Sequence, residues 1–170
     1  MPNQIVLIGV SGAGKTAVGE QIAAQSGADF HDFDAYFERL IGEDPSEFLV
    51  RRGEQAYEEA SLKVAREILG ADGVVALSPG STREEEVAQL LGKLRESGAT
   101  VVELFADTST LMRRTGLNAP RSVALGPTRR ILADMVASYR ADFEGLADLV
   151  IDTSLSKPEH VASRILAFTA

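Results

Sequence analysis

A glycine-rich stretch at residues 9–16 is the first place where the chain could do chemistry, and it directly follows an apolar run. It reads GVSGAGKT and fits the pattern G-x-x-x-x-G-K-[ST] at Gly9, Gly14, Lys15 and Thr16. Glycines allow a tight turn in which backbone N–H groups and a helix N-terminus converge on a phosphate. Lys15 can then bridge the β- and γ-phosphates of a nucleotide, and the Thr16 hydroxyl can ligate Mg²⁺. The stretch predicts a phosphate-binding loop (P-loop).

This loop must be positioned by the strand before it and the helix after it, and both are visible as patterns. Apolar runs predict strands at residues 5–8, 30–33, 74–77, 101–105 and 149–151. Helical periodicity predicts helices at residues 17–26, 53–69 and 84–97. Uniformly apolar strands suit a parallel sheet that is covered on both faces, and alternating strands and helices imply right-handed crossovers. We expect one three-layer α/β/α domain over residues 1–170, built on a five-stranded parallel sheet.

The composition is that of an ordinary globular domain, with 170 residues, 45% of them hydrophobic and 25% charged. No apolar run approaches the roughly 18 residues that span a bilayer, and the N-terminus has no basic stretch leading into an apolar core. The absence of cysteine excludes disulfides and zinc–thiolate sites. A net charge of −8 argues against binding to a nucleic-acid backbone. We expect a cytoplasmic protein that binds neither nucleic acid nor membrane.

A P-loop alone does not distinguish a GTPase, a motor ATPase and a small-molecule kinase. The guanine-reading segment N-K-x-D of GTPases is missing from the sequence. The third predicted strand ends in Leu-Ser-Pro-Gly at residues 77–80, where large ATPases need a carboxylate pair. The size and the short connections favour a monomeric kinase that acts on a small acceptor.

Further motifs follow the P-loop in a fixed order. They are Asp32-Phe33-Asp34, Gly53-Glu54-Gln55 at the start of a long helix, Arg113-Arg114-Thr115-Gly116, Arg121, Arg140 and Val150-Ile151-Asp152-Thr153. In order and spacing this series resembles the shikimate kinase family over nearly the whole chain. The resemblance implies a nucleoside-monophosphate-kinase-like P-loop fold with a mobile lid at about residues 112–126. It also implies transfer of the ATP γ-phosphate to a hydroxyl of a small cyclic acid.

The resemblance also assigns roles to residues on the ATP side. The nucleotide would bind Gly12, Ala13, Gly14, Lys15, Thr16, Ala17 and Arg114. Asp32 would hold Mg²⁺ through water, beside Thr16, and Asp34 would orient and deprotonate the attacking hydroxyl. An Asp pair after a strand can also be a turn with a helix N-cap. Arg121 would close over the phosphates from the lid and act with Lys15 and Asp34 in catalysis. Arg114 matches a position near adenine, with a solvated helix face as the equal alternative.

The acceptor would contact Asp34, Glu58, Gly80 and Arg140. Arg140 matches a family arginine that grips the acceptor carboxylate, and an exposed helix charge is the alternative. The departures from the family cluster here. A family arginine and a glutamate three positions further on are replaced by Glu58 and Ser61, three successive glycines by Ser78-Pro79-Gly80, and a serine on the third strand by Ala76. Pro79 cannot donate a backbone hydrogen bond.

An exchange of arginine for Glu58 reverses the charge of a carboxylate-binding pocket. Like charges about 4 Å apart repel by about 4 kcal/mol at an effective dielectric constant of 20. This repulsion applies if Glu58 faces the pocket; alternatively it turns to solvent or pairs with Arg51, Arg52 or Arg140. The acceptor is then shikimate on family grounds, or a neutral or amine-bearing ring polyol or cyclitol on pocket grounds.

Two other functions are considered for this sequence. One is a non-catalytic, nucleotide-binding relative that serves as a sensor or partner module. The complete set of Lys15, Thr16, Asp32, Asp34 and Arg121 speaks against it, because such a protein has little need of all five. The other is a nucleotide or gluconate-type kinase, which would need a basic acceptor groove or an adenine-reading lid that the sequence does not display.

Overall fold

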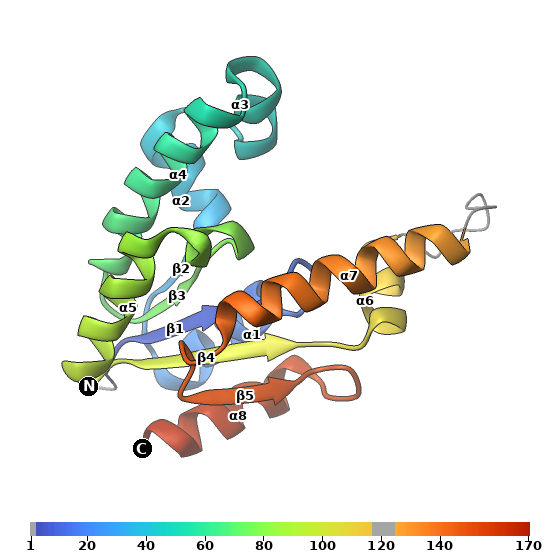
Figure 1. Ribbon diagram of the computed structural model, residues 1–170. Coiled ribbons are helices and arrows are strands. Elements are labelled where there is room, and N and C mark those ends of the chain that lie inside the picture. Colours follow the sequence, from blue (N-terminus) through green and yellow to red (C-terminus); the bar gives the residue numbers. More distant parts are fainter. Residues whose placement is uncertain (1–2, 117–124) are drawn as a thin grey trace.

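The computed structural model describes residues 3–116 and 125–170 (Figure 1). Within them, one sheet contains β1 (Ile5–Ile8), β2 (Phe30–Asp32), β3 (Val74–Ala76), β4 (Thr100–Phe105) and β5 (Leu149–Asp152). The strands are all parallel and lie in the order β2-β3-β1-β4-β5. Each predicted strand is present, with end points that differ by one residue at most. The predicted fold class is confirmed.

Helices cover both faces of the sheet. They are α1 (Lys15–Ser26), α2 (Phe33–Ile41), α3 (Pro45–Arg52), α4 (Glu54–Leu69), α5 (Glu85–Glu96), α6 (Thr108–Arg114), α7 (Leu125–Phe143) and α8 (Pro158–Thr169), with a 3₁₀ helix η1 (Pro79–Arg83). Helices α1 and α8 pack together on one side, and α5 and α7 lie on the other (Figure 1). No helix within residues 3–116 and 125–170 is long and apolar enough to cross a membrane.

The central strands are buried on both faces, as their uniform apolar character predicts. All four residues of β1 are at most 1% exposed, and β3 is equally covered. Gly9 follows β1 directly with a φ of 150°, and a Cβ there would lie 2.3 Å from the Leu104 carbonyl oxygen of β4. Only glycine lets the chain pass this close to the neighbouring strand, so the first P-loop position is fixed by backbone packing.

The short helices α2 and α3 are among those that lie outside the three predicted helical ranges. Each begins at an aspartate N-cap: Asp32 accepts a hydrogen bond from the Asp34 N–H, and Asp44 accepts from the two residues after Pro45. They are held by an aromatic cluster in which the buried Phe37 ring contacts those of Phe48 and Tyr57, at centroid distances of 5.5 and 5.9 Å. With α4 they form an arm beyond the β2 edge of the sheet (Figure 1).

Candidate active site

The P-loop joins β1 to α1 and is closed by its own backbone. Gly14 caps α1 in the left-handed conformation with a φ of 104°, and the Ala13 N–H donates to the Val10 carbonyl at 3.1 Å. Lys15 and Thr16 are the first residues of α1, so their N–H groups lie where a helix has no internal acceptors. The loop therefore presents the backbone donors that bind a phosphate.

The Lys15 ammonium is held inside this loop. Its Nζ donates to the Gly9 carbonyl at 2.6 Å and to the Val10 carbonyl at 3.1 Å. Burial lowers the pKa of Lys15 from 10.5 to about 8, and the carboxylates of Asp32 and Asp34 oppose this shift. The two carboxylates therefore stabilise the charged form of Lys15 only in part. An anion bound in the loop would stabilise it further.

The two aspartates after β2 have different environments. Asp32 accepts a hydrogen bond from the Thr16 hydroxyl at 2.8 Å through Oδ1, and it caps α2 through Oδ2. The alternative of a helix N-cap is thus observed for Asp32, and its role toward Mg²⁺ stays a prediction. Burial raises the pKa of Asp34, the carboxylates of Asp32 and Asp44 add to this shift, and Lys15 opposes it.

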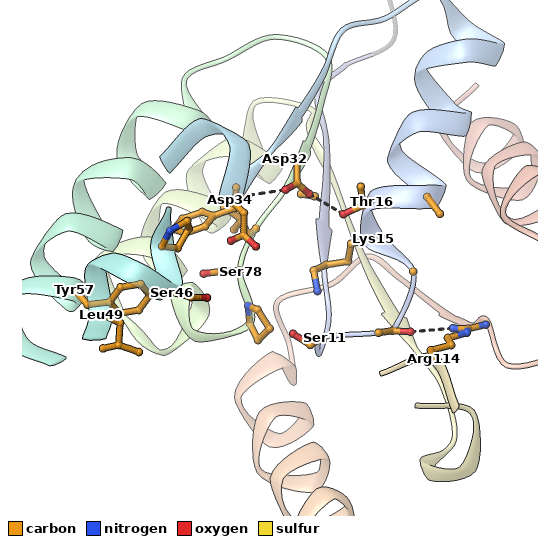
Figure 2. A pocket seen from close by; sticks show the side chains of 18 residues that line it. Ser11, Lys15, Thr16, Asp32, Asp34, Ser46, Leu49, Tyr57, Ser78 and Arg114 are labelled. Carbon is orange, nitrogen blue, oxygen red and sulfur yellow. Dashed lines mark hydrogen bonds between the residues drawn. The ribbon is translucent and has the colours of Figure 1, made fainter. Parts of the chain in front are cut away.

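These groups share one cleft of about 530 Å³ (Figure 2). Lys15 and Thr16 form one wall, Asp32 and Asp34 face them, and Ser78 lies beyond (Figure 2). The complete lining is Ser11, Gly12, Gly14, Lys15, Thr16, Ala17, Asp32, Phe33, Asp34, Pro45, Ser46, Leu49, Tyr57, Ala76, Leu77, Ser78, Pro79 and Arg114. The structure thus brings the predicted phosphate, metal and base residues into one space.

Arg114, and not its neighbour Arg113, turns toward the P-loop. Its guanidinium donates to the Gly12 carbonyl at 3.1 Å, the Thr153 hydroxyl at 3.0 Å and the Thr153 carbonyl at 2.7 Å. Thr153 Oγ1 in turn donates to the Ala13 carbonyl at 2.6 Å. From the sequence, Thr153 was named only as part of a motif and was given no role. In the structure it follows β5 and connects that strand to the P-loop by a hydrogen bond. Arg114 therefore braces the loop as well as lining the cleft.

A second cavity of about 440 Å³ shares Leu49, Tyr57 and Ser78 with the cleft and contains residues predicted to bind the acceptor. Glu58, Ser61 and Gly80 line it, as do Arg83 and Tyr139. The alternative partners Arg51 and Arg52 are bonded to Glu43 at 3.3 and 3.5 Å. Glu58 lines this cavity and is also exposed to solvent, and it is not paired with Arg51 or Arg52.

Arg140 is bonded to a buried carboxylate of β4. Its Nε donates to Glu103 of β4 at 2.8 Å, and its guanidinium lies 4.2 Å from the centre of the Phe105 ring. The Glu103 side chain is only 6% exposed, so it requires a cation beside it. This demand accounts for the orientation of Arg140, which is not paired with Glu58. A carboxylate-binding role of Arg140 stays a prediction.

Arg121 and most of the predicted lid lie outside the described residues.

Comparison with known proteins agrees with this geometry. Residues 11–170 match the sequence profile of the family described as shikimate kinase. The chain is 35% identical over 161 residues to a shikimate kinase of Thermobifida fusca, covering 94% of this chain and 91% of that protein. The chain belongs to the shikimate kinase family. A shikimate kinase of Paramagnetospirillum magneticum is 32% identical over 163 residues, 95% of this chain and 82% of that protein.

Solved structures of other proteins show the same fold. Shikimate kinase from Acinetobacter baumannii, solved in complex with shikimate, superposes with a TM-score of 0.84 at 24% identity, covering 98% of this chain and 92% of that one. A gluconokinase from Sinorhizobium meliloti reaches a TM-score of 0.62 at 22% identity, covering 98% and 90%. Membership of the family confirms the predicted class of enzyme, an ATP-dependent phosphotransferase that acts on a hydroxyl group.

Proposed function

We propose that the protein transfers the γ-phosphate of ATP, with Mg²⁺, to a hydroxyl of shikimate or a related small ring polyol. The observation that carries this proposal is the shared cleft in which Lys15 of the P-loop faces Asp34 at the start of α2. A phosphate on the P-loop and a hydroxyl beside Asp34 would then meet in one space. Positioning of this kind, together with charge stabilisation, supplies most of the catalysis in phosphoryl transfer.

Lys15 would bind and orient the phosphates. Its Nζ is already anchored on two loop carbonyls, so little side-chain freedom is lost when the nucleotide arrives. The N–H groups at the start of α1 add donors and a helix dipole of the right sign. During transfer, the ammonium would stabilise the negative charge that develops on the bridging oxygen of the leaving ADP. Arg121, on family grounds, would add a second cation from the lid.

The side chains of Thr16 and Asp32 fit Mg²⁺. The Thr16 hydroxyl and the Asp32 carboxylate are hard oxygen ligands, and they lie 2.8 Å apart. Among the described residues, no group of three or more His, Cys, Asp or Glu is arranged to hold a metal. This pattern suits Mg²⁺, which is commonly bound by one or two protein oxygens together with substrate phosphates and water. When bound, the ion would neutralise charge on the β- and γ-phosphates.

Asp34 would orient the acceptor hydroxyl and take its proton. A general base works best when its pKa approaches the operating pH, and burial moves the pKa of Asp34 upward in this direction. As the hydroxyl oxygen bonds to phosphorus, its proton would pass to the Asp34 carboxylate, and the bond from phosphorus to ADP would break. We further propose that the protein acts as a cytoplasmic monomer without nucleic-acid or membrane partners, in keeping with its net charge of −8.

Incubation with ATP, Mg²⁺ and shikimate tests the proposal. ADP release should depend on the acceptor, and mass spectrometry should find one added phosphate on the ring compound. Lys15→Ala should abolish this turnover and weaken the binding of ATP more than that of adenosine. ATP binding without phosphorylation of any ring polyol would instead favour the non-catalytic, nucleotide-binding alternative.

A further inference from the structure

We infer that the preferred acceptor is a small ring polyol that carries a positively charged amine, with the ammonium group held in the second cavity by Glu58. This inference rests on the proposed kinase activity and specifies its substrate class. The reaction itself is unchanged: a ring hydroxyl beside Asp34 gains the γ-phosphoryl group, its proton goes to Asp34, and ADP leaves. The amine takes no part in the bond changes and serves only in recognition.

The second cavity is placed to receive the far side of a ring whose hydroxyl lies in the cleft. It shares Leu49, Tyr57 and Ser78 with the cleft, so one small molecule can contact both spaces. Tyr57 belongs to α4 and Ser78 lies between β3 and η1. The two cavities of about 530 and 440 Å³ together exceed the needs of the phosphates and leave room for a ring with a substituent.

The charges that line the second cavity are mostly negative. Glu54, Glu58 and Glu84 are among its lining residues, against a single cation, Arg83. Glu54 and Glu58 are one turn apart on α4, a spacing at which like charges repel. Within residues 3–116 and 125–170, the ion pairs of the fold include none of these three glutamates. A cation in the cavity would relieve this repulsion, whereas a carboxylate would add to it.

Arg83 does not offset this charge, because it is bonded to α7. Its Nε donates to Asp142 at 2.6 Å, and its terminal nitrogen donates to Ser138 at 3.0 Å. The guanidinium also lies 3.9 Å from the centre of the Tyr139 ring. Asp142 neutralises the charge of Arg83, and the bonds to α7 fix its direction. An anionic acceptor would have to compete with Asp142 for this arginine.

A polar atom without a partner lies in the same wall. Ser61 follows Glu58 by three residues on α4, and both line the cavity. Ser61 Oγ is buried and has no hydrogen-bond partner among the described residues. A buried hydroxyl without a partner is costly, and since it can donate or accept, a polar ligand group here would be favoured. The charge of the cavity then decides the kind of group: an ammonium has three donors and a positive charge, which suits the Glu58 carboxylate.

A series of three acceptors with one ring tests the inference. The series consists of shikimate, its neutral methyl ester, and the cationic analogue in which an aminomethyl group replaces the carboxylate. All three present the same ring hydroxyls, so differences in kcat/KM report on charge at the second cavity. We expect the cationic compound to be favoured over shikimate by about tenfold or more, with the ester between them. Preference for shikimate would overturn the inference and leave the kinase proposal intact.

Matched variants test whether Glu58 causes the preference for the cationic acceptor. Glu58→Gln keeps the size of the side chain and should reduce the cation-to-anion ratio of kcat/KM by about tenfold. Glu58→Arg, with or without Ser61→Glu, should raise turnover of shikimate. Glu59→Gln is the control, because this exposed neighbour is bonded to Gln55 and does not line the cavity. An unchanged ratio in Glu58→Gln, in a variant that melts like the wild type, would contradict the inference.

Binding separates this inference from the kinase proposal. Calorimetry with a non-hydrolysable ATP analogue measures the affinity for the three ring compounds even if none is phosphorylated. Tighter binding of the cationic compound without turnover would support the amine site and refute the kinase proposal. Equal or tighter binding of shikimate would overturn the amine site, whatever the turnover.

Discussion

ATP binding should weaken as the pH rises through the pKa of Lys15. Burial holds this pKa at about 8 in the free protein, so the ammonium is about 90% protonated near pH 7 and about 10% protonated near pH 9. The phosphates of bound ATP favour the charged form and raise the pKa of Lys15 in the complex. Binding above pH 8 must therefore take up a proton, and the affinity must fall as the pH rises.

The size of the effect follows from the pKa of the free protein. If only the charged lysine binds the phosphates, the Kd for ATP should rise about tenfold from about pH 7 to about pH 9, or ~1.4 kcal/mol. Calorimetry at saturating Mg²⁺, in buffers of different ionisation enthalpy, gives both the Kd and the protons taken up. Uptake should approach about one proton near pH 9 and nearly vanish near pH 7. Lys15→Met should show a weak Kd without this slope. A wild-type Kd that stays constant over this range would refute the reasoning.

Three further substitutions test separate parts of the molecule. Asp34→Asn should lower kcat by about 10²–10⁴-fold with little change in the Kd for ATP, and an unchanged kcat would exclude Asp34 as the base. Arg121→Ala should lower kcat much more than it raises the KM for ATP, whereas a raised KM with level kcat would make Arg121 a ground-state contact. Gly73→Ala should cost roughly 2–4 kcal/mol in urea unfolding. Gly73 has a φ of 93°, and its Cβ would lie 2.5 Å from the Asp29 carbonyl oxygen. Gly92→Ala, inside α5 with no atom within 4 Å of the new Cβ, is the control and should stabilise by up to about 1 kcal/mol. Equal stability of the two variants would contradict the steric reasoning.

The sheet could be predicted from the sequence because its central strands are simple. A parallel strand that is buried on both faces must be apolar at every position, and residues 5–8 meet this demand without exception. The helices α2 and α3 were missed because they are short and their N-cap aspartates were not used as helix starts. Asp32 was interpreted chiefly by its possible chemistry. The series Asp44-Pro45-Ser46-Glu47 is a helix start that could have been recognised, with an N-cap and a proline at the first position.

The site also has a part that could be predicted from the sequence and a part that could not. The P-loop could be predicted because its function depends on consecutive backbone groups, which the sequence displays directly. The partner of Arg140 could not, because Glu103 lies 37 residues away and meets it only when α7 packs across β4. One signal was present: Glu103 interrupts the apolar run of β4, and a charge in a buried strand requires a partner. The sequence could not show which of several arginines would supply it.

The opposite pKa shifts of Lys15 and Asp34 link the two halves of the cleft. Burial disfavours both charges, so it lowers the pKa of Lys15 and raises that of Asp34. Bound ATP would favour the ammonium form of Lys15. Mg²⁺ beside Thr16 and Asp32 would counter the negative charge of the phosphates near Asp34 and leave that carboxylate able to accept the proton of the hydroxyl. The two opposite shifts therefore suit one complex, in which the phosphates meet Lys15 and the metal ion lies on the side of the aspartates.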